Sequence, residues 1–72
     1  MISIDMKIKE VRTAKKVSLE RLSNETGIDR KHLAEVENKN ADEIILSDIV
    51  LISQALGVAI EDLFVVTKYK LV

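Results

Sequence analysis

The chain contains no proline and only two glycines, so few positions are available at which its helices can be broken. Gly27 and Gly57 each follow a segment with periodic apolar residues, and each precedes a β-branched residue, Ile28 or Val58. This pattern is typical of a helix that ends in a residue with left-handed backbone conformation, which glycine adopts without steric cost. The two glycines therefore predict the C-terminal ends of two helices.

Apolar periodicity predicts a first helix from Met6 to Lys16, because Ile8, Val11 and Ala14 recur every three residues. The lysines of this segment are expected to point mostly outward.

Two capping residues predict the next helices. Ser18 offers a side-chain oxygen that can cap a second helix, which runs to about Glu25. Asp29 can cap a third helix over residues 30–38, and the apolar residues Leu33 and Val36 of this helix share one face.

A fourth helix is expected either to be capped by Ser47 or to begin just before it, and Gly57 ends it. The motif AIEDLF predicts a short fifth helix. The expected fold class is therefore all-α, a compact five-helix unit in which residues 1–72 form a single domain.

Both ends of the chain have a different composition. The runs ISI and VVTKYKLV are β-prone, and they either fray or pair as a small sheet, within one chain or across a dimer. The apolar residues of the second run are candidates for a dimer contact: Val65, Val66, Tyr69 and Leu71.

Composition excludes several classes of protein. Without cysteine there are no disulfides, zinc fingers or thiol chemistry, and a single histidine makes no metal site by itself. No pair of nucleophile and base stands out, so an enzyme is not expected, and neither is a cofactor or small-molecule ligand. The longest apolar stretch, IILSDIVLI, is far shorter than the roughly 20 residues that cross a bilayer, and there is no secretory signal. A cytoplasmic protein without membrane contact is expected.

The net charge of -1 does not by itself indicate a nucleic-acid partner. Residues 1–40 carry nine Lys or Arg against seven Asp or Glu, whereas residues 41–72 carry two against five. The basic character is therefore weak and lies in the first half of the chain, and solubility alone accounts for such an imbalance equally well.

The second and third helices, joined by a tight turn with glycine, have the form of a helix-turn-helix, although many helical domains contain such corners. The segments IKEVRTAKKVSLERLSNETGIDRKHLAEVEN and LISQALGVAIEDLF together resemble the phage-repressor-like (Xre/Cro-type) helix-turn-helix family over about residues 6–64, which leaves a tail at 65–72. This resemblance implies a compact five-helix fold, sequence-specific binding to double-stranded operator DNA, a homodimer, and a role in transcription regulation.

The resemblance also implies that Glu37 turns inward to pair with Arg12 and does not face the DNA backbone. The alternative is that the two residues are unrelated surface charges.

The third helix carries the residues that the resemblance places against bases in the major groove. Arg30 and Lys31 suit guanine edges or phosphates, or else form a solvated basic face, and His32 is either a DNA contact or a surface imidazole. Glu35 either accepts a hydrogen bond from cytosine or forms an ion pair with Lys31, four residues earlier, and we favour the ion pair. The candidate DNA contacts outside the first turns of this helix are Ser18, Arg21, Lys39 and Asn40.

The sequence departs from the family pattern at Leu19, where glutamine is common. An exposed Leu19, together with Glu35 and the acidic total charge, favours a second interpretation. In this alternative the chain keeps the fold but is a protein-interaction module, such as an antitoxin-like or anti-repressor partner, with little DNA binding.

Overall fold

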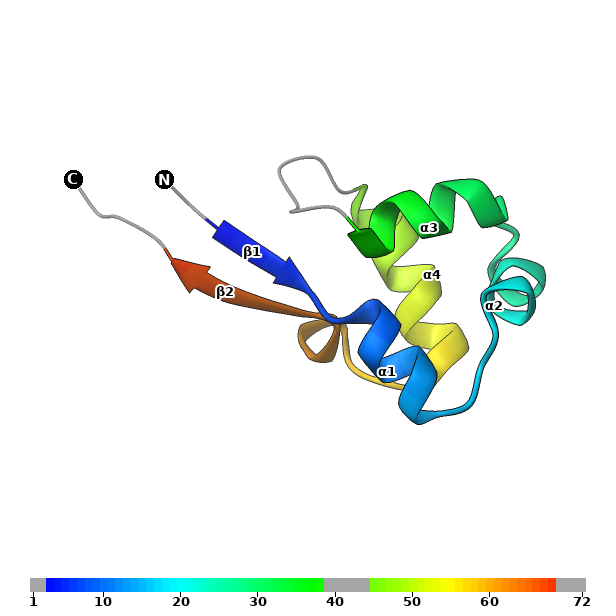
Figure 1. Ribbon diagram of the computed structural model, residues 1–72, viewed down its shortest axis with the longest axis horizontal. Helices are drawn as coiled ribbons and strands as arrows, with labels where there is room; N and C mark the ends of the chain where they lie inside the picture. Colours follow the sequence, from blue (N-terminus) through cyan, green and yellow to red (C-terminus); the bar gives the residue numbers. More distant parts are fainter. Residues whose placement is uncertain (1–2, 39–44, 69–72) are drawn as a thin grey trace.

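The computed structural model describes residues 3–38 and 45–68, which form four α-helices, a 3₁₀-helix and a two-stranded sheet (Figure 1). The elements follow one another as β1 (Ser3–Met6), α1 (Ile8–Ala14), α2 (Leu19–Thr26), α3 (Arg30–Asn38), α4 (Leu46–Leu56), η1 (Ile60–Leu63) and β2 (Phe64–Lys68). No helix in these ranges is both long enough and apolar enough to cross a membrane.

The prediction of a compact, mostly helical unit is confirmed, but the described residues contain four α-helices and a two-stranded sheet, so the five-helix, all-α form of the prediction is not confirmed. AIEDLF forms the 3₁₀-helix η1, because Ala59 before it and Phe64 after it are both extended and leave room for only four helical residues. Such a short segment favours the tighter hydrogen bonding of a 3₁₀-helix over an α-helix. The Asp62 carboxylate closes the turn by accepting a hydrogen bond of 3.1 Å from the Ala59 backbone N–H.

The two β-prone ends pair with each other within the chain. Strands β1 and β2 are antiparallel, with Ile4 opposite Val66, Asp5 opposite Val65 and Met6 opposite Phe64, and the register is irregular between Ser3 and Ile4. The ribbon projects from the helices, and its β1 strand lies on the side that faces α3 (Figure 1). Two of the residues named as dimer candidates, Tyr69 and Leu71, lie outside the described residues.

The first helix is shorter at both ends than periodicity predicted. Met6 belongs to β1, and the Lys7 N–H donates to the Leu63 carbonyl at 2.7 Å, which ties the start of α1 to η1. At the other end Lys16 has a positive φ of 58°, so its left-handed backbone ends the helical path.

The predicted caps are mostly present. Gly27 and Gly57 have φ of 77° and 67°, as expected for left-handed residues at helix ends. The Ser18 hydroxyl accepts from the Arg21 N–H at 3.0 Å, and the Asp29 carboxylate accepts from the Lys31 N–H at 3.1 Å. Helix α4 begins just before Ser47, with Ile45 as an N-cap that makes no side-chain hydrogen bond, so Ser47 is not the cap.

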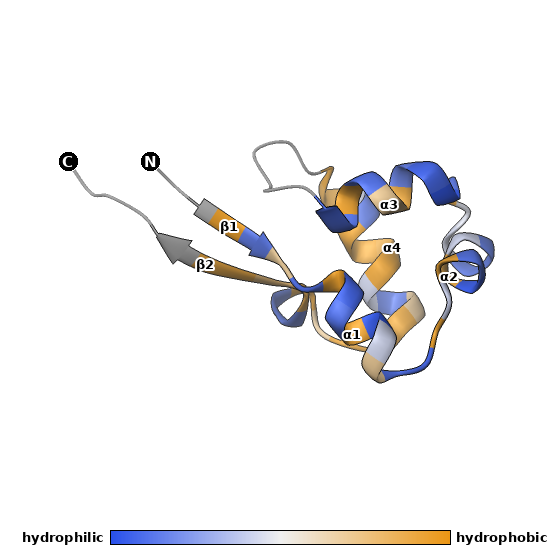
Figure 2. Ribbon diagram, viewed as in Figure 1, coloured by the Kyte–Doolittle hydropathy of each residue, from blue (hydrophilic) through white to orange (hydrophobic). Residues whose placement is uncertain are grey.

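One fully buried side chain from each helical element builds the core: Ile8, Leu22, Leu33, Ile52 and Leu63. Helix α4 lies among the other helices and is apolar along much of its length, whereas α2 and α3 are largely hydrophilic (Figure 2). The side chain of Leu19 is half-buried and packs against this core, so it is not an isolated exposed leucine. Helices α2 and α3 thus cover α4 and keep their polar faces toward solvent.

Candidate functional site

Three hydroxyl hydrogen bonds fix the turn between α2 and α3. The Ser23 hydroxyl donates to the Ile28 carbonyl at 2.6 Å, and the Thr26 hydroxyl donates to the Leu22 carbonyl at 2.8 Å. The Thr26 oxygen also accepts from the Ile28 N–H at 3.1 Å. These bonds satisfy backbone groups that a tight turn leaves without partners, so the angle between the two helices is well defined.

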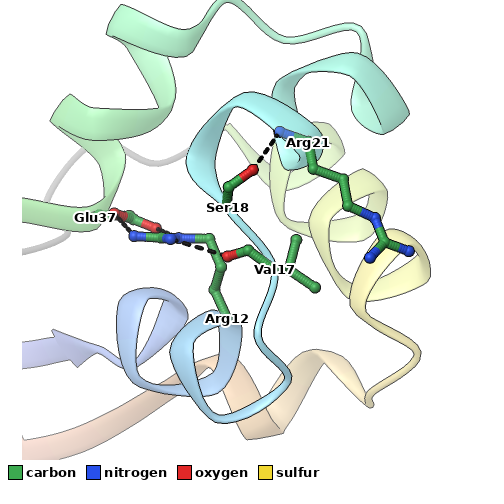
Figure 3. Close-up of polar contacts among 5 residues, drawn as sticks. All are labelled: Arg12, Val17, Ser18, Arg21 and Glu37. Carbon is green, nitrogen blue, oxygen red and sulfur yellow. Dashed lines mark hydrogen bonds and ion pairs between the residues drawn. The ribbon is translucent and has the colours of Figure 1, made fainter.

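An ion pair anchors the C-terminal half of α3 to α1 (Figure 3). Arg12 binds both carboxylate oxygens of Glu37, with Nε at 2.7 Å from Oε2 and Nη2 at 3.2 Å from Oε1. Its Nη1 also donates to the Val17 carbonyl at 3.0 Å. The side chains are only 13% and 5% exposed. The pair that the resemblance implied is present, Glu37 faces inward, and the alternative of two unrelated surface charges is wrong.

The opposite side of α3 is open to solvent. Leu33 and Val36 are buried, so the side of the helix facing away from the core carries residues at the spacing i, i+3, i+4 and i+7. These four residues, which we call the open face, line a shallow hollow: Lys31, Ala34, Glu35 and Asn38. The open face presents one cation, one carboxylate, one amide and one methyl group.

Lys31 and Glu35 do not form the ion pair that we favoured. Among the residues that the structure describes, their charged groups are not within 4.0 Å, and both side chains are exposed. An exposed pair of this kind gains little over hydration of each charge by water, so nothing holds the two groups together. The Glu35 carboxylate remains available as a hydrogen-bond acceptor on the open face.

His32 contacts α4. Its Nε2 lies 3.0 Å from Oδ2 of Asp48, and the two side chains are 44% and 16% exposed. The contact joins the first turn of α3 to the first turn of α4. No local pattern predicts it, because the two residues are 16 positions apart. The sequence prediction of a DNA contact or a surface imidazole missed this partner.

The candidate DNA contacts at α2, Ser18 and Arg21, form hydrogen bonds with groups of the same helix. The Ser18 hydroxyl caps the helix, and the Arg21 Nε donates to Glu25 Oε1 at 2.9 Å (Figure 3 shows Ser18 and the direction of Arg21). The Arg21 side chain is 63% exposed, so its charge reaches the surface but is partly offset by Glu25. Lys39 and Asn40 lie outside the described residues.

The structure thus brings Arg30, Lys31 and Glu35 to the exposed surface of α3, next to the end of the turn after α2. It directs His32 toward α4 and Glu37 toward α1. Within residues 3–38 and 45–68 there is no cluster of three or more acidic or histidine side chains that suits a metal ion.

A family model described as a Cro/C1-type helix-turn-helix DNA-binding domain matches residues 7–68, which include all four helices. No curated protein matches the chain.

Proposed function

Because the chain belongs to the Cro/C1-type helix-turn-helix DNA-binding domain family, we propose that it binds specific DNA sequences and regulates transcription. In this proposal α3 enters the major groove, and α2 crosses the sugar-phosphate backbone. The observation that carries the proposal is the open face of α3, which lies opposite the buried Leu33 and Val36.

Each residue of the open face has a chemistry that suits a base edge in the major groove. Lys31 suits the O6 and N7 acceptors of guanine, and Asn38 suits adenine. The Glu35 carboxylate accepts from the amine of cytosine, and the Ala34 methyl group packs against the methyl group of thymine. Because Glu35 is not held by Lys31, we now favour the cytosine contact.

The flanking residues have other roles in this proposal. Arg30, at the start of α3, and the exposed Arg21 on α2 contact phosphates or guanine. His32 holds α3 against α4 through Asp48, and its exposed part remains close enough to the helix start for a phosphate contact. With Glu20, Glu25, Asp29 and Glu35 also exposed, we expect weak non-specific affinity and about 3 to 5 phosphates neutralised per protomer.

We further propose that the chain acts as a homodimer. Two copies of α3 then meet two half-sites separated by about one helical turn, roughly 34 Å. Half-burial of Leu19 removes the exposed apolar side chain that favoured a protein-interaction module at this position.

The test is fluorescence-anisotropy titration of DNA selected from a random pool, repeated at about 50 and 200 mM salt. We expect Arg30→Ala and Lys31→Ala to abolish selective binding without lowering the melting temperature, because both side chains are exposed. Lys9→Ala, at an exposed position of α1, removes the same charge outside α3 and is the matched control. If selective binding survives both α3 substitutions, the assignment of α3 as the helix that reads the DNA bases is wrong.

The base contacts have a sharper test. Glu35→Gln should relax or change the preference at one cytosine position, since a neutral amide offers both a donor and an acceptor. Loss of one good base contact corresponds to about 1 to 3 kcal/mol of discrimination. An unchanged base preference at every position would show that Glu35 does not face the groove.

A further inference from the structure

The imidazole of His32 contacts α4 on one side and solvent on the other. Its Nε2 lies 3.0 Å from Oδ2 of Asp48, whose side chain is 16% exposed, whereas the His32 side chain is 44% exposed. Within residues 3–38 and 45–68 the other ring nitrogen, Nδ1, has no hydrogen-bond partner. No side-chain nitrogen or oxygen of these residues is both buried and without a partner, so Nδ1 is open to solvent.

Asp48 determines which ring nitrogen of His32 carries the proton. An ionised carboxylate only accepts hydrogen bonds, so Nε2 must donate to it. A neutral imidazole has one donor and one acceptor, and its Nδ1 therefore presents a lone pair to solvent. A lone pair repels a phosphate oxygen. Only the imidazolium, in which both nitrogens are donors, can bind Asp48 and a phosphate at the same time.

We propose that His32 takes up a proton when the protein binds DNA, and that the imidazolium donates from Nε2 to Asp48 and from Nδ1 to a DNA phosphate. This inference rests on the proposed function, and it adds a dependence of DNA binding on pH. His32 is in the first turn of α3, which is the end of the helix that lies closest to the DNA in this docking geometry. Asp48 is then a positioning residue that acts through His32.

The charged groups around the ring change when DNA binds. Asp48 is the carboxylate that faces the ring from α4. Among the residues that the structure describes, α2 and β1, which also pack against α3, place no carboxylate within 4.0 Å of the ring. Arg30 and Lys31, the two residues before His32, are exposed cations and oppose a further positive charge. A phosphate offsets these cations and adds a negative charge beside the ring, so it favours the imidazolium.

The dependence on pH has a definite sign. The contact between imidazolium and phosphate is complete at low pH and is lost as the ring deprotonates, so DNA affinity should fall as the pH rises from about 6 to 8. Uptake of one proton per protomer changes the dissociation constant by at most about tenfold per pH unit. Because the His32 side chain is 44% exposed, we expect a smaller total change of about three- to fivefold per protomer.

Proton uptake can be assigned to His32 because the chain contains a single histidine. The amino terminus also titrates near neutral pH, but it is present in every variant. Isothermal titration calorimetry at about pH 7, in buffers of different ionisation enthalpy, counts the protons taken up when the protein binds a duplex selected from the random pool. We expect a fraction of one proton per protomer for the natural chain and none for His32→Gln, whose amide donates a hydrogen bond at every pH.

Two further measurements test the roles of the two ring nitrogens. In the free natural protein above about pH 8, long-range ¹H–¹⁵N spectra should show the imidazole proton on Nε2. Asp48→Ala removes the acceptor of this proton, so a neutral ring can carry it on Nδ1 and donate to DNA, and the affinity should depend less on pH. Duplexes in which one phosphate at a time is replaced by an uncharged methylphosphonate locate the partner, and one position should abolish proton uptake.

The outcomes separate this inference from the DNA-binding function. If the selected duplex is bound equally well at both ends of the pH range without proton uptake, the inference fails and the DNA-binding function stands. Proton uptake that persists in His32→Gln or with every methylphosphonate duplex overturns the assigned contact, and so does an imidazole proton on Nδ1 in the free protein. If no duplex is selected at any pH, the DNA-binding function and this inference both fail.

Discussion

We predict that substitutions of Arg12 and Glu37 lower the free energy of unfolding by unequal amounts, and that the two effects are strongly coupled. Arg12→Met leaves a carboxylate that is 5% exposed without its partner, whereas Glu37→Met leaves a guanidinium that is 13% exposed and still bonded to Val17. Breaking a buried ion pair from one side costs about 3 to 5 kcal/mol. We expect Arg12→Met to lie in that range and Glu37→Met to cost less.

The double substitution should lower the free energy of unfolding by less than Arg12→Met alone does, because it removes both charges and leaves no unpaired carboxylate. The resulting coupling energy should be about 2 to 3 kcal/mol, near the upper end for contacting residues. A chain of 72 residues has a total stability of roughly 4 to 11 kcal/mol. The Arg12→Met protein should therefore be partly unfolded at 25 °C if the total is near the lower value.

Urea denaturation followed by circular dichroism measures the four free energies of unfolding at one protein concentration, because a dimer makes the midpoint depend on concentration. Lys9→Met, an exposed charge removed from the same helix, serves as the control and should change stability by less than about 0.5 kcal/mol. Single effects that add to within about 0.5 kcal/mol, or a larger loss for Glu37→Met than for Arg12→Met, would refute this account of the pair.

Three further predictions concern α3 and the turn before it. Ser23→Ala removes the donor to the Ile28 carbonyl and should lower the free energy of unfolding by about 1 kcal/mol in urea titrations, while a loss near zero would mean that water replaces the hydroxyl. Gly27→Ala adds a methyl group that meets no atom within 4 Å, so only the strain of the positive φ remains, and calorimetry should report a loss of about 1 to 2 kcal/mol. If His32 positions α3 through Asp48, then His32→Ala and Asp48→Ala should weaken binding of selected DNA equally and the double variant no further; normal binding by Asp48→Ala alone would instead assign His32 to the DNA.

Features that depend on neighbouring residues were predictable from the sequence. The bounds of α3 and the caps at Ser18 and Asp29 were correct, because a cap joins a side chain to a backbone group two or three residues away. The left-handed conformations of Gly27 and Gly57 follow from the same short range. The pair of Arg12 with Glu37, 25 positions apart, came from the family resemblance and not from any local pattern.

The sequence predictions were wrong at positions whose structure is determined by tertiary contacts. Met6 was predicted to begin the first helix, but its pairing with Phe64 places it in a strand. The spacing of Lys31 and Glu35 permits an ion pair, but spacing does not include the competition from water. Of the candidate site residues, His32 depends most on long-range structure, because its partner Asp48 belongs to another helix.

The ribbon also has a consequence for the order of folding. Helices α2 and α3 are adjacent in the chain and can form their turn early, whereas β1 pairs with a strand on the order of 60 residues later. Closing a loop of that length carries an entropic cost on the order of 4 kcal/mol, which the few contacts of a two-stranded ribbon must offset. During synthesis β1 emerges first and remains without its strand partner until β2 has been translated. The two-stranded ribbon therefore cannot form on a nascent chain in which only the helices are complete.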